Sequence, residues 1–469
     1  PRTPMTLRRR HSLLALFLTA SVAVSGCSTI NRLNPFDRED EGPQEIAGEG
    51  QRVPIVALND RVEVAEGLKG ADFFLPTPAT VTQWALPGGT PEQSVEHIDA
   101  PAALDIAWRR GFGEGSGRGA HVTAPPVAAN GKIYVMDGQA RVTAFDAASG
   151  AQAWRVDLRP EGRRDREAFG GGLAVADGKL FVTSGYRFVA QLDAQTGAVG
   201  WRTTTEQPIH AAPTVSAGRV FAVTVDNTLL TFDAAGGAEG WTYQALSESA
   251  RILAASSPAV SGDTVVAAFG SGELVALRAA NGNDLWNEAL SRASRTNALS
   301  EIRDIPGRPV IYQGDVYAVS HSGVFSATDL RTGQARWSLP VTGITTPWPA
   351  GDVVYVVSKA GEVICVARET GQVYWITDLG ASRAKEGGRP WWQVWGGDKH
   401  TVRPIWSSPL LVNNKLVLAG STGELVSLNA KTGAVEKTVN LGSPTLIGPI
   451  AVNGVIYVAT DEAELIALR

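Results

Sequence analysis

The sequence predicts an all-β protein, an eight-bladed β-propeller of four-stranded antiparallel blades. Two observations carry this prediction: a phrase that recurs seven times after residue 140, and short apolar runs that alternate between its copies. The phrase is an apolar pair, usually an Asp nearby, a Gly, and an aromatic residue four positions beyond the Gly. Self-similarity at such spacing is typical of repeat architectures. The seven copies occupy residues 144–154, 191–201, 231–241, 276–286, 327–337, 365–375 and 427–437.

The seventh repeat unit illustrates how each unit divides into strands. From residue 407 it reads SSPLLV, NNK, LVLAG, STGE, LVSLNA and KTGAVEKTV. Alternating β-branched and other apolar residues, interrupted by turn-forming pairs, indicate short antiparallel strands. Four strands of about five residues fit into about 40 residues, and tandem four-stranded sheets form propeller blades. No stretch keeps a helical apolar period for three turns, which excludes helical repeats.

The phrase itself predicts a hairpin between the third and fourth strands of a blade. Its Gly supplies a left-handed backbone conformation, and its Asp can cap the same turn. The aromatic residue then lies in the outer strand, where a ring can wedge against the neighbouring blade. We therefore interpret these tryptophans as structural repeat residues: Trp108, Trp154, Trp201, Trp241, Trp286, Trp337 and Trp375.

The two ends of the repeat region predict how the ring closes. The eighth unit begins near Pro444 and stops at Arg469 after three strands. An unassigned strand, DIAWRRGF with Trp108, precedes the first unit and can supply the missing fourth strand. Pairing these two ends leaves no unpaired sheet edge. The propeller is thus expected to span residues 105–469.

The start of the chain predicts export and lipidation. Three Arg residues precede an apolar run, and residues 24–27 read VSGC, the bacterial lipoprotein cleavage motif. We interpret residues 1–26 as a lipoprotein signal peptide rather than a membrane span, and Cys27 as the lipidated first residue of the mature protein. Ser28 follows the cysteine, which favours an outer-membrane anchor with the body facing the periplasm.

Residues 27–104 are predicted to be a lipidated acidic tether that is partly ordered. They begin with a Pro-, Gly- and acid-rich stretch and become more apolar after Val53. Removing residues 1–26 takes away four of the 42 basic residues and none of the 47 acidic ones, so the net charge falls from −5 to −9. That charge excludes nucleic acid as the expected partner.

A search for catalytic chemistry finds little. The six His residues lie far apart without metal-ligand spacing, and the Gly-rich stretch 113–119 follows a strand without opening a helix. Cys365 alternates with apolar neighbours and is predicted to be a buried small residue. We therefore predict no catalytic residues, no metal and no cofactor, and a protein that is not an enzyme.

The repeated phrase resembles that of pyrroloquinoline-quinone (PQQ) propellers, a family that includes alcohol and glucose dehydrogenases. The resemblance implies, for the enzymes, a vicinal Cys pair, a Ca²⁺ site and a Trp that floors the quinone. This chain has only Cys27 and Cys365 and no adjacent pair. Trp391, Trp392 and Trp395 cluster in the insertion 387–400, which is either a stacking pocket or, as we favour, a surface hairpin.

The whole layout of lipidation motif, acidic tether and eight PQQ-like repeats resembles the BamB family, lipoprotein subunits of the outer-membrane β-barrel assembly (BAM) machinery. The resemblance implies a non-catalytic scaffold that binds the central barrel subunit, BamA, and aids insertion of β-barrel proteins, with unfolded outer-membrane proteins as a further class of partner. Two loops of the family contact BamA, and they correspond here to ARILAASSP (250–258) and SEIRDIPGRP (300–309). The matching residues are Arg251, Ile252, Leu253, Arg303 and Asp304.

Alternatives remain open from the sequence alone. Ile252 and Leu253 can equally be the apolar lead into the next strand. The protein can also be a PQQ-dependent dehydrogenase-like quinoprotein, or a propeller scaffold for another periplasmic partner. Gain of absorbance and activity on adding PQQ and Ca²⁺ would distinguish the quinoprotein from either scaffold.

Overall fold

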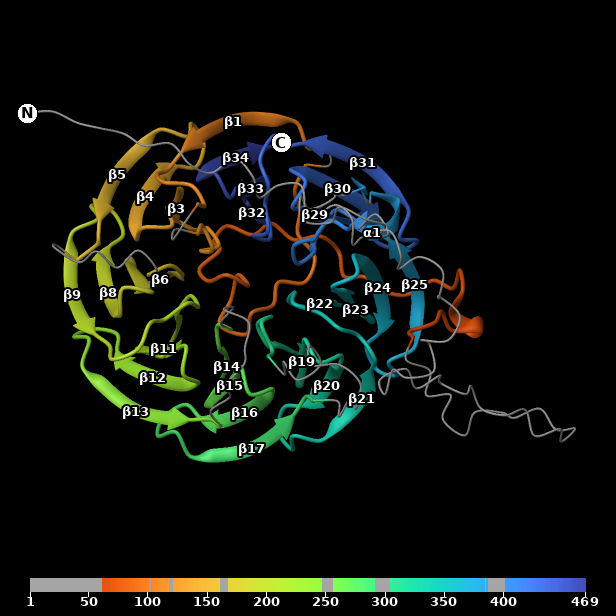
Figure 1. Cartoon of the computed structure of the whole chain (residues 1–469), viewed down its shortest axis with the longest axis horizontal. Coiled ribbons are helices and arrows are strands. Elements are labelled where there is room, and N and C mark those ends of the chain that lie inside the picture. Colours follow the sequence, from red (N-terminus) through yellow and green to blue (C-terminus); the bar gives the residue numbers. More distant parts are fainter. Residues whose placement is uncertain are drawn as a thin grey trace, which may run out of the picture. The chain divides into compact units, whose positions relative to one another are not determined.

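Four-stranded antiparallel sheets follow one another around a ring in the computed structural model, and the described residues form eight of them (Figure 1). This confirms the predicted eight-bladed propeller. The structure describes residues 61–101, 103–117, 121–160, 168–246, 256–291, 304–383, 385–386 and 401–469. All of them belong to one unit, residues 59–469. The predicted signal peptide and Cys27 lie outside these ranges.

The first four blades each run in chain order from the bore to the rim. Blade 1 is β2 (Val127–Ala129), β3 (Lys132–Met136), β4 (Arg141–Asp146) and β5 (Gln152–Asp157). Blade 2 is β6 (Gly171–Ala176), β7 (Lys179–Ser184), β8 (Phe188–Asp193) and β9 (Val199–Thr204). Blade 3 is β10 (Thr214–Ser216), β11 (Arg219–Val223), β12 (Thr228–Asp233) and β13 (Glu239–Gln244). Blade 4 is β14 (Ala259–Ser261), β15 (Thr264–Ala268), β16 (Glu273–Arg278) and β17 (Asp284–Ala289).

The other four blades complete the ring. Blade 5 is β18 (Val310–Tyr312), β19 (Asp315–Val319), β20 (Phe325–Asp329) and β21 (Ala335–Leu339). Blade 6 is β22 (Trp348–Ala350), β23 (Val353–Val357), β24 (Glu362–Ala367) and β25 (Val373–Asp378). Blade 7 is β28 (Leu410–Val412), β29 (Lys415–Ala419), β30 (Glu424–Asn429) and β31 (Val435–Asn440). Blade 8 is β32 (Ile450–Val452), β33 (Val455–Ala459), β34 (Glu464–Leu468) and β1 (Ile106–Gly111).

Ring closure follows the sequence prediction. β1 pairs antiparallel with β34, and Trp108 stands opposite Ala467. Asp105 and Arg469 exchange both backbone hydrogen bonds just beyond this pairing, at 2.7 and 2.8 Å. The outer edge of the last blade is therefore covered by the start of the propeller, which removes a free edge.

Short elements outside the blades are few in the described ranges. They are the 3₁₀ turn η2 (Glu66–Leu68), the one-turn helix α1 (Leu379–Ser382), and the two-residue pair β26 (Lys385–Glu386) and β27 (Thr401–Val402). No helix in those ranges is long and apolar enough to cross a membrane.

The repeated phrase forms the hairpin between the third and fourth strand, as blade 2 illustrates. Asp193 Oδ1 accepts hydrogen bonds from the backbone N–H and hydroxyl of Thr196, each at 3.0 Å. Gly197 adopts φ +74°, a conformation that a β-carbon disfavours. A bulge then shifts the register so that Trp201 stands opposite Gln191. The same bulge recurs in all seven phrase-bearing blades.

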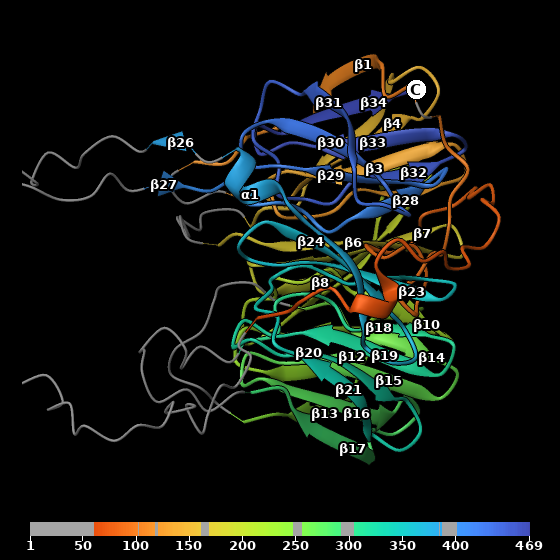
Figure 2. The same cartoon turned by 90° about the vertical axis from the view of Figure 1, so that its right-hand side faces the viewer.

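Residues 79–98, which we call the plug, cross one mouth of the bore (Figures 1 and 2). The first strand of each blade lies innermost, so the backbone groups on its edge facing the bore would otherwise be unpaired. The plug makes a hydrogen bond at, or directly beside, the first strand of every described blade. From blade 1 to blade 8, its partners are Ala128, Val175, Thr214, Val260, Ile311, Trp348, Leu411 and Asn453.

Buried side chains hold the plug in place. Trp84 is fully buried and stacks on Trp348 with ring centroids 6.4 Å apart. The amide of Gln93 accepts from Gly88 N at 2.9 Å and donates to Thr214 Oγ1 and the Pro258 carbonyl at 3.2 and 3.0 Å. The later part of the predicted tether is thus an ordered part of the propeller.

Candidate functional site

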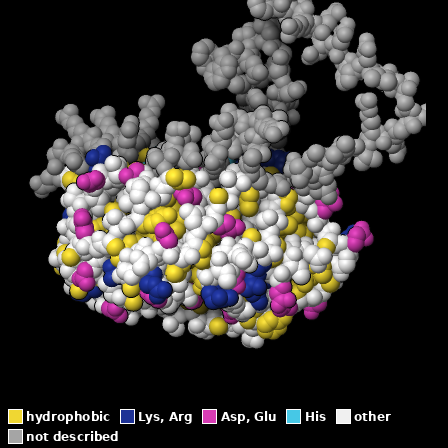
Figure 3. All heavy atoms as spheres, turned by 90° about the horizontal axis from the view of Figure 1, so that it is seen from below, with side chains coloured by type: hydrophobic (Ala, Val, Ile, Leu, Met, Phe, Trp, Pro, Cys, Tyr) yellow, Lys and Arg dark blue, Asp and Glu magenta, His cyan; other side chains and the backbone are white. Residues whose placement is uncertain are grey.

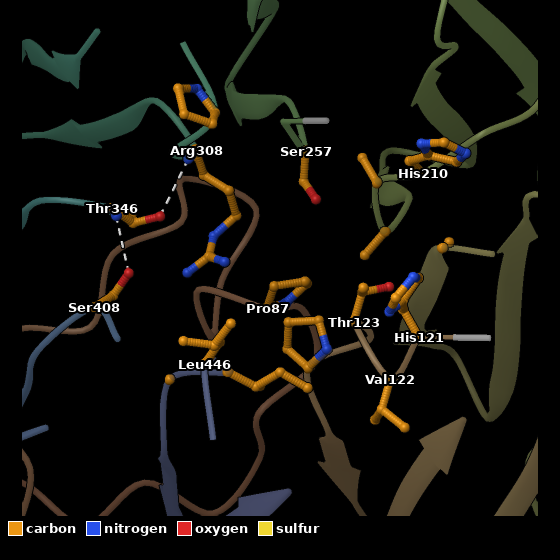
Figure 4. Close-up of a pocket in the computed structure, with 18 of the residues that line it drawn as sticks. Pro87, His121, Val122, Thr123, His210, Ser257, Arg308, Thr346, Ser408 and Leu446 are labelled. Carbon is orange, nitrogen blue, oxygen red and sulfur yellow. Dashed lines mark hydrogen bonds between the residues drawn. The ribbon is translucent and has the colours of Figure 1, made fainter. Parts of the chain in front are cut away.

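The plug turns the bore into a cavity that it closes at one end. The cavity measures about 410 Å³, and Pro87 of the plug contributes to its floor (Figure 4). Its wall comes from the segments that lead into the first strand of each blade, because those strands are innermost. One lining residue from each blade, in order, is Thr123, Gly170, His210, Ser257, Arg308, Thr346, Ser408 and Leu446.

Arg308 projects into this cavity from the segment before β18 (Figure 4). Its backbone N–H donates to Thr346 Oγ1 at 3.1 Å, and Thr346 N–H donates to Ser408 Oγ at 2.8 Å. These two hydrogen bonds link blades 5, 6 and 7 and hold the backbone of Arg308, from which its side chain extends into the cavity.

The guanidinium of Arg308 lacks a counterion in the described part of the chain. No described carboxylate forms an ion pair with it, and its Nε is buried without an acceptor. Burial lowers the pKa of Arg308 to about 10, so the group stays protonated at neutral pH. A buried charge without a partner costs free energy that a bound anion would recover.

The cavity also has an aromatic wall on the side of blades 1 to 3. The Phe169 ring stacks on His210, with centroids 4.7 Å apart, and meets His121 edge-on at 5.0 Å. In Figure 4 the two histidines lie on the side of the cavity across from Arg308. Apolar side chains of Val122, Ile344 and Leu446 complete the lining.

Asp461 is the acidic residue of the cavity wall. It belongs to the turn between β33 and β34, and burial raises the pKa of its carboxyl, against a smaller lowering by a backbone hydrogen bond from Leu446 and by His121. Asp461 and Arg308 come from blades 8 and 5 and form no ion pair within the described ranges.

The predicted partner-binding residues fall mainly outside the described ranges. Arg251, Ile252, Leu253 and Arg303 lie there, whereas Asp304 is described and only 2 % exposed. The Asp304 carbonyl accepts from His321 N–H at 2.8 Å, in the turn between β19 and β20.

The structure does bring together the described ends of the two predicted partner segments. Ser256 belongs to the first segment, 250–258, and its Oγ donates to the carbonyl of Gly307 in the second segment, 300–309, at 3.1 Å. Leu246 precedes the first segment and is 66 % exposed. Ser257 and Arg308 line the cavity, so both segments end on the face to which the cavity opens.

The seven repeat tryptophans lie in the outer strands and face the next blade. In five of them the indole N–H donates to a carbonyl of that blade at 2.7–3.1 Å, as from Trp154 to Ala194. Trp108 and Trp375 instead have a buried indole N–H without a partner. At these two blade interfaces the equivalent carbonyl oxygens belong to Ala147 and Ala430. They accept hydrogen bonds from the hydroxyl groups of Tyr457 and Tyr355.

The residues present do not fit the quinone and metal site of the PQQ enzymes. Within the described ranges, no group of three His, Cys, Asp or Glu side chains is placed to hold a metal ion. Cys365 is buried in β24 without a disulfide, and burial raises the pKa of its thiol well above the usual value. The Trp-rich insertion 387–400 lies outside the described ranges. No step through a quinone follows from this site.

Sequence reasoning missed Arg308 and the plug. Arg308 lies within SEIRDIPGRP and Trp84 within QWALPGG. Neither stretch repeats in the chain, so the repeat pattern did not point to them. A Pro-Gly-Arg sequence directly ahead of an innermost strand is the one signal that could have marked the arginine.

Fold and cavity define an eight-bladed propeller of PQQ-like repeats whose bore is closed at one mouth. A sequence profile of the family described as outer membrane protein assembly factor BamB matches residues 92–165, 138–377 and 379–469. The chain belongs to the BamB family, which confirms the resemblance predicted from its sequence.

Individual proteins that carry the BamB name are similar to this chain over most of its length. Outer membrane protein assembly factor BamB of Moranella endobia (strain PCIT) is 24 % identical over 407 residues, covering 86 % of this chain and 97 % of its own. The crystal structure of BamB from Moraxella catarrhalis matches with a TM-score of 0.63 and 18 % identity, covering 78 % of this chain and all of that one. A europium-containing methanol dehydrogenase also matches, with a TM-score of 0.63, 14 % identity, and coverage of 81 % and 89 %. At these identities the two structures establish the fold alone.

Proposed function

We propose that this protein is a non-catalytic scaffold of outer-membrane protein assembly, held at the outer membrane by lipid on Cys27 and facing the periplasm. Membership of the BamB family supports the assembly role, since its relatives carry the name of an assembly factor. The proposed partner is a BamA-like barrel subunit, with unfolded outer-membrane proteins as further clients.

The observation that carries the proposed binding face is the Ser256–Gly307 hydrogen bond. It joins Ser256 of segment 250–258 to Gly307 of segment 300–309, next to the cavity-lining residues Ser257 and Arg308 of blades 4 and 5. One partner surface can therefore contact both segments. Arg251 and Arg303 supply charge-assisted hydrogen bonds in this proposal, with Ile252, Leu253 and the exposed Leu246 as apolar anchors.

Asp304 is not proposed to contact the partner directly. Because it is buried, it acts by fixing the end of the second segment through its neighbours, including His321. On the side of the rim that Figure 3 shows, acidic and basic side chains are interspersed without an extended patch of one sign. That side therefore offers no charged surface to which a partner of opposite charge would be drawn.

The test is capture of the barrel subunit from detergent-solubilised outer membranes by the Cys27-anchored protein. Reversing both charges with Arg251→Glu and Arg303→Glu is expected to reduce recovery of the subunit at least about tenfold, which corresponds to about 1.4 kcal/mol. Charge reversal at Asp304 is avoided because it would place a cation in a buried site.

The matched control reverses two arginines of the same blades at their other end. Arg278 is the last residue of β16, Arg331 lies in the hairpin after β20, and both are exposed. The Arg278→Glu and Arg331→Glu variant should capture the subunit as the wild type does. Equal capture by both double variants would rule out the proposed face, while loss in both would point to net charge rather than to this face.

A further inference from the structure

We propose that the central cavity is a binding site for a small organic carboxylate, with Arg308 receiving the carboxylate and the apolar and aromatic wall receiving the body of the molecule. This site is separate from the proposed partner segments, and nothing in the family assignment requires it.

The first argument is the state of Arg308. A guanidinium offers five N–H donors, and buried donors are normally satisfied. Within the described ranges, Arg308 makes one hydrogen bond, from its backbone N–H to Thr346, and its buried Nε has no acceptor. No described acid forms an ion pair with it. Among the described residues, the cavity therefore holds a cation without a counterion.

The second argument is the shape of the site. A volume of about 410 Å³ falls within the range of small-molecule pockets. The plug closes one mouth through Pro87, so a ligand enters from the opposite face and meets a floor. The innermost strand edges on the plug side are already paired with residues 79–98, which leaves no room for a peptide threaded through the bore.

The third argument decides between kinds of anion. A carboxylate matches the planar fork of arginine with two parallel hydrogen bonds. Across from Arg308 lie the His121 and His210 rings, which Phe169 contacts, and Leu446 adds an apolar side chain to the lining. A strongly hydrated inorganic anion would leave those surfaces without contacts, whereas an organic acid buries its apolar body against them.

Asp461, the acidic residue of the cavity wall, comes from blade 8 and forms no ion pair with Arg308 in the described part of the chain. The guanidinium therefore remains available to a ligand.

The test uses the full-length chain purified in detergent and calorimetric titration with benzoate, with benzamide as the neutral isostere and inorganic phosphate as the alternative anion. Benzoate is expected to bind, and benzamide to bind at least tenfold more weakly. Arg308→Gln, which keeps hydrogen-bonding atoms but removes the charge, should weaken benzoate binding at least tenfold. The control Arg278→Gln, at the exposed end of β16, should leave benzoate binding unchanged.

A second variant tests the cavity rather than the charge. Gly448 lines the cavity, and a β-carbon there would meet nothing closer than Ser408 at 3.6 Å. Gly448→Leu should therefore fold and block benzoate by filling space. A melting curve of each variant without ligand checks folding.

Three results would overturn the proposal. One is that benzoate fails to bind the wild type, and another is that Arg308→Gln or Gly448→Leu binds benzoate as the wild type does. The third is phosphate binding as tightly as benzoate, which would assign the cavity to inorganic anions. Loss of partner capture with benzoate binding intact would bear on the proposed function alone.

Discussion

Gly197 lies against the indole of Trp154, so close that a β-carbon on the glycine would stand 2.7 Å from Cε3 of the ring. The two residues belong to consecutive copies of the repeated phrase and to neighbouring blades. Each phrase thus supplies a Gly that receives the previous blade's Trp, and the first six phrases also supply a Trp that covers the next blade's Gly. The pairs are Trp108–Gly150, Trp154–Gly197, Trp201–Gly237, Trp241–Gly282, Trp286–Gly333, Trp337–Gly371 and Trp375–Gly433.

Substituting this glycine should damage the interface between blades. In Gly197→Ala the β-carbon clashes with Trp154 and the backbone remains at φ +74°. We expect a loss of about 2–4 kcal/mol, from left-handed strain together with overpacking. Chemical denaturation measures the loss.

Gly178→Ala is the matched control. Gly178 has φ +72°, almost the same backbone conformation, but nothing lies within 4 Å of its β-carbon position. This variant should lose only about 1–2 kcal/mol, the cost of strain. Equal losses in the two variants would mean that the Trp154 contact contributes nothing.

The seventh phrase breaks the pattern, with Lys437 where the Trp should be, and ring closure explains why. Blade 8 has no third-to-fourth hairpin, because its outer strand β1 comes from the other end of the chain. There is no phrase glycine for a Trp to cover. Instead Lys437 Nζ donates to the Ala103 carbonyl and lies 3.4 Å from Asp105, in the segment that leads into β1.

Restoring the repeat consensus at this position should therefore fail to stabilise the protein. Consensus substitutions commonly add stability, but Lys437→Trp removes the contacts with Ala103 and Asp105 and gains no glycine. We expect a melting temperature equal to or below that of the wild type. In contrast, Trp375→Lys should lower it strongly, because Trp375 covers Gly433. A clear rise for Lys437→Trp would contradict this account of the closure.

The contrast between these residues shows what the sequence could predict. Blade number, hairpins and the role of Trp154 follow from periodic residues, because each repeat meets the same neighbours. The plug contains no sequence repeat. Its hydrogen bonds go mostly to backbone groups at the edges of strands, and any residue type can supply a backbone group, so the sequence does not reveal these contacts. Arg308 could not be recognised as a site residue because its surroundings come from all eight blades and the plug.

Acidification should loosen the plug through His97. This buried ring accepts a hydrogen bond from Asn414 N–H at Nε2, 2.8 Å away, while Nδ1 lies 2.6 Å from the Pro76 carbonyl. With both contacts made, the ring is neutral, and burial lowers the pKa of His97, against a smaller raising effect of the Pro76 hydrogen bond. The unfolded chain then binds the proton more readily than the folded one as the pH falls below about 6.5.

Stability contributed by His97 is therefore complete above the ordinary histidine pKa and declines as the pH falls through and below it. Hydrogen exchange of residues 79–98 should become faster at pH 5.5 than at pH 7.5, beyond the intrinsic effect of pH. His97→Gln retains an acceptor but does not titrate, so its plug should show a smaller change. An identical pH response in wild type and variant would exclude His97 as the cause.

Removing the charge at Arg308 should stabilise the protein without ligand. A cation that has no counterion among the described residues opposes folding, and replacing buried ionic groups with apolar ones of similar volume often adds about 1–4 kcal/mol. Arg308→Met keeps the length of the side chain and the Thr346 contact, which the backbone makes. We expect a higher melting temperature for this variant, whereas Arg278→Met, which loses only an exposed ion pair with Asp263, should change little. A lower melting temperature for Arg308→Met would mean that the folded chain itself satisfies the guanidinium, and the cavity would then have no uncompensated charge to offer an anion.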